Sequence, residues 1–322
     1  MKQLSIGKYR GLQQCSTPNG ALSILALDHR NNLRQALEKA GVENAGPQEL
    51  TEFKLQVTGA LAPVASAVLL DPEFGAAQAV AASGLPGTAG LLVSVEATGY
   101  TGEPTGRESN LLPGWSVAKI KRMGASAVKM LVYYHPKSPT AKQNEDLIKQ
   151  VAADCAEQDI PFMVEPLSFS IDPNQKRVSG PERQDIVLET ARRLTPLGMD
   201  ILKAEFPLDI DSENSEAAWE KACQALTETS SVPWVLLSAA VDFETFVRQT
   251  TIACEHGATG AAVGRAVWQE AVELKSAERE KFLADLARQR MKKITTICDE
   301  KARPWNQVYQ AKPITEIWYR SY

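Results

Sequence analysis

Eight short apolar runs recur along the chain, and longer amphipathic segments separate them. The runs are residues 21–28, 66–71, 90–96, 127–134, 161–166, 201–207, 234–239 and 260–265. Most of these runs are almost continuously apolar rather than alternating, which is typical of parallel strands covered on both faces. The pattern therefore predicts eight strands of a parallel sheet.

The segments between the runs have the periodicity of amphipathic helices. Residues 144–158 and 180–198 each carry apolar side chains at spacings that place them on one helical face. Residues 242–258 begin with Asp242, a favourable N-cap residue, and end near Gly257, which suits a helix C-terminus. We therefore expect a helix between successive strands.

This alternation of strands and helices predicts a (β/α)8 TIM barrel. Polar residues near the ends of the runs recur about every 34 residues, close to the ~31 residues per unit of a ~250-residue barrel. The rival is an open doubly wound sheet, but no G-x-G-x-x-G follows the first run. We expect residues 1–322 to form a single barrel domain, with 272–322 as a C-terminal helical extension and tail.

Composition limits the classes of function. The chain has 23% charged residues, a net charge of −4 and no basic tract, which argues against nucleic-acid or anionic-membrane partners. Its five cysteines form no C-x-x-C motif and are typical of reduced thiols rather than of disulfides or a zinc site. No signal-peptide pattern and no apolar run of ~18 residues is present, so we expect a soluble, cytoplasmic protein.

Polar residues stand at the end of nearly every predicted strand. In a barrel, the carboxyl ends of the strands face the active site. The residues are Asp28 and Arg30, Asp71, Glu96, Lys129, Glu165, Lys203, Ser238 and Arg265. Any one of them can belong to a structural ion pair, but core packing does not explain the set. The set predicts a catalytic site at this end of the barrel.

Lys203 is the candidate nucleophile because it follows Ile201 and Leu202 inside an apolar run. Burial and a cationic neighbour, Lys129, both lower the pKa of a lysine, and a neutral amine attacks a carbonyl carbon to form a Schiff base. The protonated imine then acts as an electron sink for carbon–carbon bond cleavage. The structural alternative is that Lys203 only pairs with Glu165 or Glu205.

Two carboxylates are candidates for moving protons. We expect Glu165 to shuttle protons during imine formation and hydrolysis, and Asp28 to take the hydroxyl proton of the bond that breaks. Lys129 would help to position the substrate hydroxyl groups. The alternative is that both carboxylates only neutralise the two lysines.

The last two runs suggest a phosphate site. The strings LLSAAVD and AAVGRAVW are similar to the corner of many barrels where backbone N–H groups and an added cation hold a phosphate. Ser238, Ala239, Gly264 and Arg265 fit that corner. An anionic group at the other end of the substrate would need a second cation, and Arg30 or Arg107 could provide it.

Metal catalysis is the main chemical competitor. A metal site needs a compact set of histidines or carboxylates. The histidines are His29, His135 and His256, and His29 alternates out of phase with Asp28 on its strand. We therefore expect no metal ion and no other cofactor.

Eight strings in order, from about residue 20 to 270, resemble the class I tagatose-1,6-bisphosphate aldolase family, which includes the sulfofructose-phosphate aldolases. They are LALDHR, AVLLDPEFG, VEATGY, GWSVAKIKRMGASAVKMLVYY, IPFMVEP, DILKAEFP, PWVLLSAAVD and GATGAAVGRAVW. The resemblance implies that Lys203 forms the Schiff base, Lys129 is the second active-site lysine, Glu165 the acid/base and Asp28 the aspartate of the first strand.

Two positions depart from this family's pattern. His29 stands where the family usually has glutamine, which changes a group near the far end of the substrate. Ala240 stands where the family has glycine, in the loop expected to hold phosphate. A methyl group there removes backbone freedom and can crowd the anion. Both departures bear on substrate identity rather than on the imine chemistry.

These observations predict a class I aldolase that reversibly cleaves a phosphorylated ketose to dihydroxyacetone phosphate and an anionic aldehyde. The ketose would be tagatose or fructose 1,6-bisphosphate, or 6-deoxy-6-sulfofructose 1-phosphate. The alternatives are a non-catalytic sugar-phosphate-sensing barrel, a metal-dependent barrel lyase, or a Schiff-base enzyme of different outcome such as a transaldolase. We also expect a homo-oligomer, because the aromatic tail (Trp318, Tyr319, Tyr322) offers a packing surface, unless it covers the barrel's own helices.

Overall fold

The computed structural model describes residues 1–175, 177–320 and 322. Within these residues, eight parallel strands close into one barrel in chain order, from β2 to β9. The strands are β2 Leu22–Leu27, β3 Ala67–Leu70, β4 Gly90–Ser94, β5 Ala127–Tyr133, β6 Phe162–Leu167, β7 Ile201–Ala204, β8 Trp234–Leu237 and β9 Gly260–Val263. Each strand falls on the apolar run that predicted it, and the (β/α)8 barrel is confirmed.

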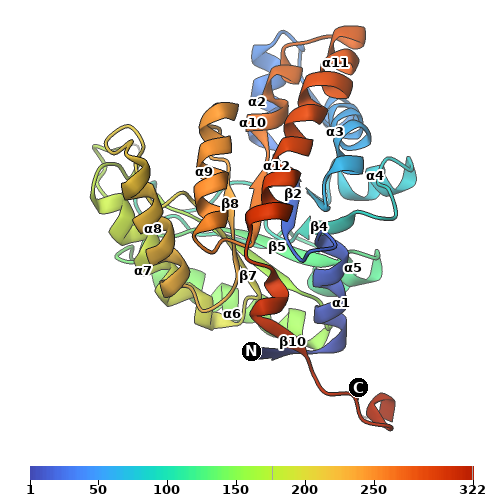
Figure 1. Cartoon of the computed structure of the whole chain (residues 1–322). Coiled ribbons are helices and arrows are strands. Elements are labelled where there is room, and N and C mark those ends of the chain that lie inside the picture. The colour runs from blue at the N-terminus through green and yellow to red at the C-terminus, as the bar shows by residue number, and fades with distance from the viewer. Residues whose placement is uncertain (176, 321) are drawn as a thin grey trace.

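Helices surround the barrel (Figure 1). They are α2 Asn31–Lys39, α3 Pro47–Leu61, α4 Ala76–Ala81, α5 Val117–Arg122, α6 Ala141–Glu157, α7 Glu182–Leu194, α8 Glu216–Thr229, α9 Phe243–Glu255, α10 Arg265–Trp268, α11 Ser276–Phe282 and α12 Arg288–Lys301. The helices predicted in 144–158, 180–198 and 242–258 are confirmed as α6, α7 and α9. The Asp242 side chain caps α9 by accepting a hydrogen bond from the Thr245 N–H at 3.0 Å.

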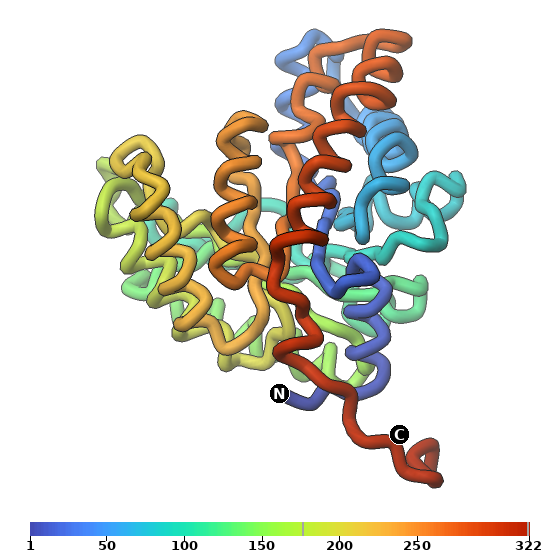
Figure 2. Tube along the Cα trace, viewed as in Figure 1, coloured from blue at the N-terminus to red at the C-terminus, as the bar shows by residue number. Residues whose placement is uncertain are grey.

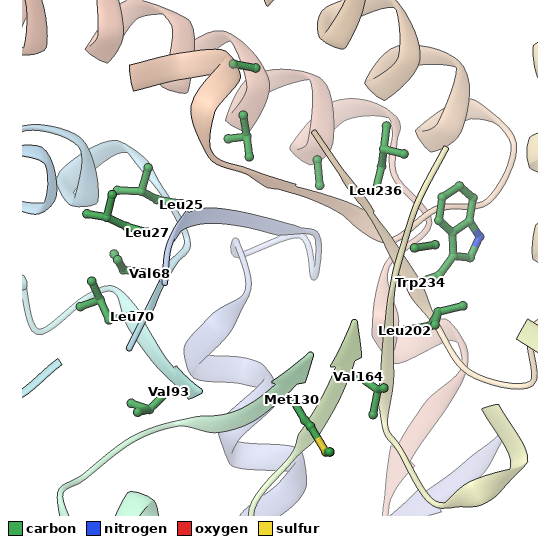
Figure 3. Close-up of a cluster of buried hydrophobic side chains, with 14 of the residues drawn as sticks. Leu25, Leu27, Val68, Leu70, Val93, Met130, Val164, Leu202, Trp234 and Leu236 are labelled. Carbon is green, nitrogen blue, oxygen red and sulfur yellow. The ribbon is translucent and has the colours of Figure 1, made fainter. Parts of the chain in front are cut away.

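Alternate residues of each strand face either the helices or the barrel interior. The outward row packs under the helices and forms the main core, part of which Figure 3 shows. Its labelled members are Leu25, Leu27, Val68, Leu70, Val93, Met130, Val164, Leu202, Trp234 and Leu236. Because both faces of every strand are covered, the strands read as continuous apolar runs in the sequence.

The N-terminal end of the barrel is closed by both ends of the chain. Helix α1 (Ile6–Cys15) lies across it, and β1 (Lys2–Leu4) pairs in parallel with β10 (Tyr309–Ala311). Leu12, Trp305 and Tyr309 pack with the lowest inward-facing side chains of the strands in a second apolar cluster. At Gly11 a Cβ atom would lie 2.3 Å from the Ser126 carbonyl oxygen, so only glycine permits this close approach.

The chain after β9 returns to the barrel and then leaves it. Helix α12 packs against α9 and against strands β2 and β9, so it belongs to the outer ring. After β10 the tail leaves the barrel (Figure 2), and at its end the Tyr322 hydroxyl contacts the Asp159 carboxylate and the Gly7 N–H. The description of residues 1–322 as one domain with an extension from residue 272 stays a prediction. Among the residues described, no helix is long and apolar enough to span a membrane.

Candidate active site

A pocket of about 510 Å³ opens at the carboxyl ends of the barrel strands. It is lined by all nine residues predicted for catalysis and substrate binding: Asp28, Arg30, Lys129, Glu165, Lys203, Ser238, Ala239, Gly264 and Arg265. A larger hollow of about 960 Å³ lies at the other end of the barrel, beside Tyr9 and Trp305, and none of the nine residues lines it. The predicted chemistry therefore converges on the smaller pocket.

Strand register explains why Glu165 and Lys203 meet. Met163 of β6 and Ile201 of β7 are paired partners whose side chains belong to the inward-facing apolar cluster. Glu165 and Lys203 each follow two residues later and so share the inward face, because side chains at i and i+2 of a strand point to the same side. The Lys203 Nζ lies 2.9 Å from the Glu165 Oε1.

Lys129 of β5 lies at the centre of three carboxylates. Its Nζ lies 2.5 Å from the Asp28 Oδ2, 2.7 Å from the Glu96 Oε1 and 3.0 Å from the Glu165 Oε2. The Lys129 side chain is fully buried. Glu165 therefore bridges the two lysines, with one oxygen toward Lys129 and the other toward Lys203.

Burial and charge act in opposite directions on these groups. Burial lowers the pKa of Lys129, but the charges of Asp28, Glu165 and Glu96 outweigh it and raise that pKa well above its ordinary value. Burial raises the pKa values of Asp28 and Glu165, but Lys129 and Lys203 outweigh it and hold both carboxyls below their usual range. At neutral pH Lys129 is an ammonium ion and Asp28 and Glu165 are carboxylates.

This charge balance changes the expected role of Lys129. Three carboxylates compensate the Lys129 charge, so the clearest role of Lys129 is to hold Asp28 and Glu165 in place. Glu96 was noticed in the sequence only as a strand-end residue, and its contact with Lys129 was not predicted.

The alternative that Lys203 only forms a structural ion pair with Glu165 or Glu205 is partly supported. Lys203 pairs with Glu165, whereas Glu205 accepts a hydrogen bond from the Ser168 N–H at 2.8 Å and pairs with Arg183 at 3.3 Å. The Lys203–Glu165 contact is both a salt bridge and a route along which a proton can move. It is therefore compatible with the structural and the catalytic interpretation.

The ends of β8 and β9 form the opposite part of the pocket. The Ser238 Oγ accepts a hydrogen bond from the Gly264 N–H at 3.3 Å. Ala239 and Ala240 both have left-handed backbones, with φ of 44° and 60°. Ala240 thus occupies, at a conformational cost, a position where the resemblance expects glycine.

Arg265 supplies an uncompensated cation to this part of the pocket. Burial lowers the pKa of Arg265, and the charge of Glu165 partly opposes that effect. Among the described residues no carboxylate forms an ion pair with Arg265. A half-buried arginine without an acidic partner is suited to bind an anionic ligand.

Two strand-end residues are used differently from the prediction. Asp71 does not line the pocket but forms a fully buried ion pair with Lys54 of α3. Arg30 lines the pocket, but its guanidinium already contacts the Glu73 carboxylate at 2.8 Å and the Glu96 carbonyl oxygen at 2.8 Å. Asp71 is thus a structural residue, and the charge of Arg30 is largely compensated.

Tyr133 and His29 also line the pocket. Tyr133 lies four residues after Lys129 and therefore on the same face of β5. This even spacing is visible in the sequence and could have placed Tyr133 at the site. His29 packs edge-on against Trp268, with ring centroids 5.4 Å apart, and its buried Nδ1 has no hydrogen-bond partner among the residues described. Burial lowers the pKa of His29 to about 4, so its imidazole is neutral at pH 7.

The histidines do not assemble into a ligand set. His135 lies near Phe169, with ring centroids 6.2 Å apart, and does not line the pocket. In the part of the chain that the structure describes, no group of three or more His, Cys, Asp or Glu residues is arranged to hold a metal ion.

Comparisons with known proteins support an aldolase. The model of the DeoC/LacD family aldolases matches residues 22–270, which include every strand of the barrel. A tagatose 1,6-diphosphate aldolase of Listeria monocytogenes is 31% identical, and the match covers 95% of each chain. Tagatose 1,6-diphosphate aldolase 2 of Enterococcus faecalis is 33% identical, over 84% of this chain and 86% of the relative.

Solved structures agree in fold. An archaeal fructose 1,6-bisphosphate aldolase has a TM-score of 0.58 at 22% identity, over 89% of this chain and 98% of the other. A Schiff-base-forming fructose-1,6-bisphosphate aldolase has a TM-score of 0.56 at 21% identity, over 87% and 98%. The chain therefore belongs to the DeoC/LacD aldolase family, and it is an aldolase.

Proposed function

We propose that the protein reversibly cleaves a phosphorylated ketose to dihydroxyacetone phosphate and an anionic aldehyde, through a Schiff base on Lys203. The observation that carries this proposal is the Lys203 amine in the strand-end pocket, 2.9 Å from a carboxylate oxygen of Glu165. An amine and a proton-accepting group at this distance are what imine formation needs.

The first half of the reaction forms the imine. Lys203 gives one proton to Glu165, and its neutral Nζ attacks the C2 carbonyl carbon of the ketose. Transfer of a second proton from the nitrogen to the carbonyl oxygen gives the hydroxyl of a carbinolamine. Glu165 then returns its proton to that hydroxyl, which leaves as water and leaves the protonated imine. Its position between Lys203 and Lys129 supports this role, because a carboxylate held by two cations keeps one orientation through both transfers.

The second half breaks the C3–C4 bond. Asp28 takes the proton of the C4 hydroxyl, the aldehyde leaves, and the bonding electrons pass into the protonated imine to form an enamine. Protonation at C3 and addition of water then release dihydroxyacetone phosphate and regenerate Lys203. Asp28 is suited to the first step because Lys129 holds it ionised, 2.5 Å from the Lys129 Nζ.

The dihydroxyacetone-phosphate end would lie at the ends of β8 and β9. Arg265 offers the uncompensated charge, and Ser238, Ala239 and Gly264 bring hydroxyl and backbone groups beside it. The relatives named as tagatose 1,6-diphosphate aldolases make tagatose 1,6-bisphosphate the first ketose to test. Fructose 1,6-bisphosphate differs from it in the configuration at C4, and 6-deoxy-6-sulfofructose 1-phosphate differs both at C4 and in the terminal anion.

A cleavage assay with each of these three ketoses tests the proposal. The assay measures the release of dihydroxyacetone phosphate, and a chelator is present throughout. Cleavage that survives the chelator and disappears in Lys203→Met is the expected result. Activity that the chelator abolishes would instead favour a metal-dependent lyase. No cleavage together with tight sugar-phosphate binding would favour a sensing barrel.

We further propose that the protein acts in the cytoplasm as a homo-oligomer. The five cysteines are all buried and unpaired, as is usual where thiols stay reduced. The tail exposes large apolar side chains, including Ile314, Ile317 and Tyr319, which are 58%, 56% and 61% exposed. Apolar groups gathered in this way are typical of surfaces that a second chain covers.

A further inference from the structure

Resting on the proposed function, we propose that Arg107 binds the anionic group of the aldehyde fragment and so determines that the substrate is charged at both ends. Arg107 lies in the segment 95–116, between β4 and α5. The sequence names Arg30 or Arg107 for this role and places Arg30 among the binding residues. The contacts of the two side chains separate them.

Arg30 is already engaged by protein acceptors. Its guanidinium pairs with Glu73 and donates to the Glu96 carbonyl oxygen, both at 2.8 Å. Arg107, by contrast, donates through Nε to the Pro104 carbonyl oxygen at 3.1 Å, and no carboxylate of the described residues pairs with it. Its terminal nitrogens therefore keep both their positive charge and free donors for a ligand.

Three aromatic rings surround the Arg107 guanidinium. Its central carbon lies 4.7 Å from the ring centre of Tyr100, 5.3 Å from that of Tyr133 and 5.0 Å from that of Phe169. Tyr133 lines the pocket, so the guanidinium lies one ring away from the pocket interior. An arginine confined by three rings has less side-chain freedom left to lose when it binds an anion.

The backbone of Arg107 is also anchored. Its carbonyl oxygen accepts hydrogen bonds from the Thr140 hydroxyl at 3.0 Å and from the Asn144 Nδ2 at 3.1 Å. The buried Asn144 side chain also donates to the Tyr133 carbonyl oxygen at 2.9 Å and accepts from the Ser109 N–H at 3.1 Å. One side chain thus ties the loop to the end of β5.

The position in the barrel fits a doubly charged substrate. Around the closed barrel, β5 lies four strands from β9 in either direction and is therefore on the opposite wall. Arg265 stands after β9, Lys203 on β7, and Arg107 beside the end of β5. A ketose with one anion at Arg265 and its carbonyl at Lys203 would direct its other end toward Arg107. Phosphate and sulfonate share the oxygen fork that arginine recognises.

The test is the condensation reaction with Arg107→Gln, using dihydroxyacetone phosphate and either glyceraldehyde 3-phosphate or 3-sulfolactaldehyde. The KM for the anionic aldehyde should rise about 10- to 100-fold, as expected for the loss of a charge-assisted hydrogen bond. The KM for dihydroxyacetone phosphate and the rate of its trapping on Lys203 should not change. Whichever aldehyde the wild type prefers identifies the anion. Arg10→Gln, at the other end of the barrel, is the matched control.

A purely structural role of Arg107 predicts something different. Loss of the stacked side chain would then slow trapping and raise both KM values together, or lower kcat alone, and either result would overturn the proposal. Arg107→Lys keeps the charge without the planar fork and should give a KM between those of the wild type and Arg107→Gln. A wild-type protein that forms no adduct with dihydroxyacetone phosphate would overturn the proposed function, and this proposal with it.

Discussion

At the scale of single residues, the site depends on the charge of Lys129. Asp28, Glu96 and Glu165 all approach its buried ammonium within 3.0 Å. Removing one partner of a buried ionic cluster leaves the others uncompensated, which typically costs about 3–5 kcal/mol. The same change frees Asp28 and Glu165 from the cation that lowers their pKa values.

We therefore expect Lys129→Met to lose about 3–5 kcal/mol of unfolding free energy at pH 7, together with its activity. Urea denaturation measures the first effect and a cleavage assay the second. The exposed Lys119 of α5 provides the control, because Lys119→Met should change stability by less than ~0.5 kcal/mol. Equal losses in the two variants would mean that the buried cluster contributes no more than a surface lysine.

His29 gives the stability a pH dependence of known sign. Its folded-state pKa of about 4 lies below the ordinary value of 6.5 because the side chain is buried. Between these two values the unfolded chain binds more protons than the folded one, so stability rises with pH in this window and is complete above it. Acidification from pH 7 to pH 4.5 should destabilise the wild type through this residue.

His29→Gln removes this contribution and serves as the matched variant. The difference in unfolding free energy between wild type and His29→Gln should be constant above about pH 7. As the pH falls toward about 4.5, the wild type should lose more stability than His29→Gln. Denaturation at four or five pH values measures it. Parallel pH curves for the two proteins would show that His29 titrates in the folded state as it does in the unfolded state.

The sequence predicted these residues because chemistry and strand position coincide. Lys203, Glu165, Lys129 and Asp28 are charged residues in otherwise apolar runs, and the two-residue period of a strand places them on one face. Glu96 and Tyr133 follow the same rule and were not assigned. Asp71 was misplaced because its partner, Lys54, comes from helix α3, and nothing local in the sequence indicates that contact.

At the scale of elements, the loop after β8 stores backbone strain at Ala240. A non-glycine residue with φ of 60° costs roughly 1–2 kcal/mol relative to glycine. Ala240→Gly should therefore stabilise the protein by up to about 1 kcal/mol, since the gain is partly offset by the greater freedom of glycine in the unfolded chain. Thermal unfolding measures the change.

The same substitution in a helix should have the opposite sign. Ala153 is an exposed residue in the interior of α6, where Ala→Gly costs about 1 kcal/mol. If Ala240→Gly and Ala153→Gly destabilise the protein equally, the left-handed backbone at Ala240 is not strained. A lower KM for dihydroxyacetone phosphate in Ala240→Gly would indicate that the Ala240 methyl group crowds the phosphate.

Elements of the barrel were predicted well, whereas the closure of its lower end was not. The strands are continuous apolar runs, and α9 has a capping aspartate, so each carries its own local signal. Strands β1 and β10 have three residues each and pair across nearly the whole chain. Short strands with distant partners leave no local pattern, because their stability comes from packing against α1 and Trp305.

At the scale of the whole molecule, the tail after β10 bears on oligomeric state. Ile317 and Tyr319 are more than half exposed. If a second copy covers the tail, Ile317→Ser combined with Tyr319→Ser should shift the protein toward monomer in sedimentation experiments. Ile171→Ser, which changes an exposed isoleucine elsewhere, should leave the distribution unchanged. A wild type that sediments as a monomer at all concentrations would contradict the homo-oligomer.

Covalent trapping is the most direct test of the Schiff base on Lys203. The protein is incubated with dihydroxyacetone phosphate, reduced with borohydride, digested and mapped by mass spectrometry. A Schiff base on Lys203 predicts one stable adduct, on Lys203, and no adduct in Lys203→Met, although Lys129 lies in the same pocket. An adduct on Lys129 instead, or no adduct while cleavage is abolished by a chelator, would contradict the Schiff base on Lys203.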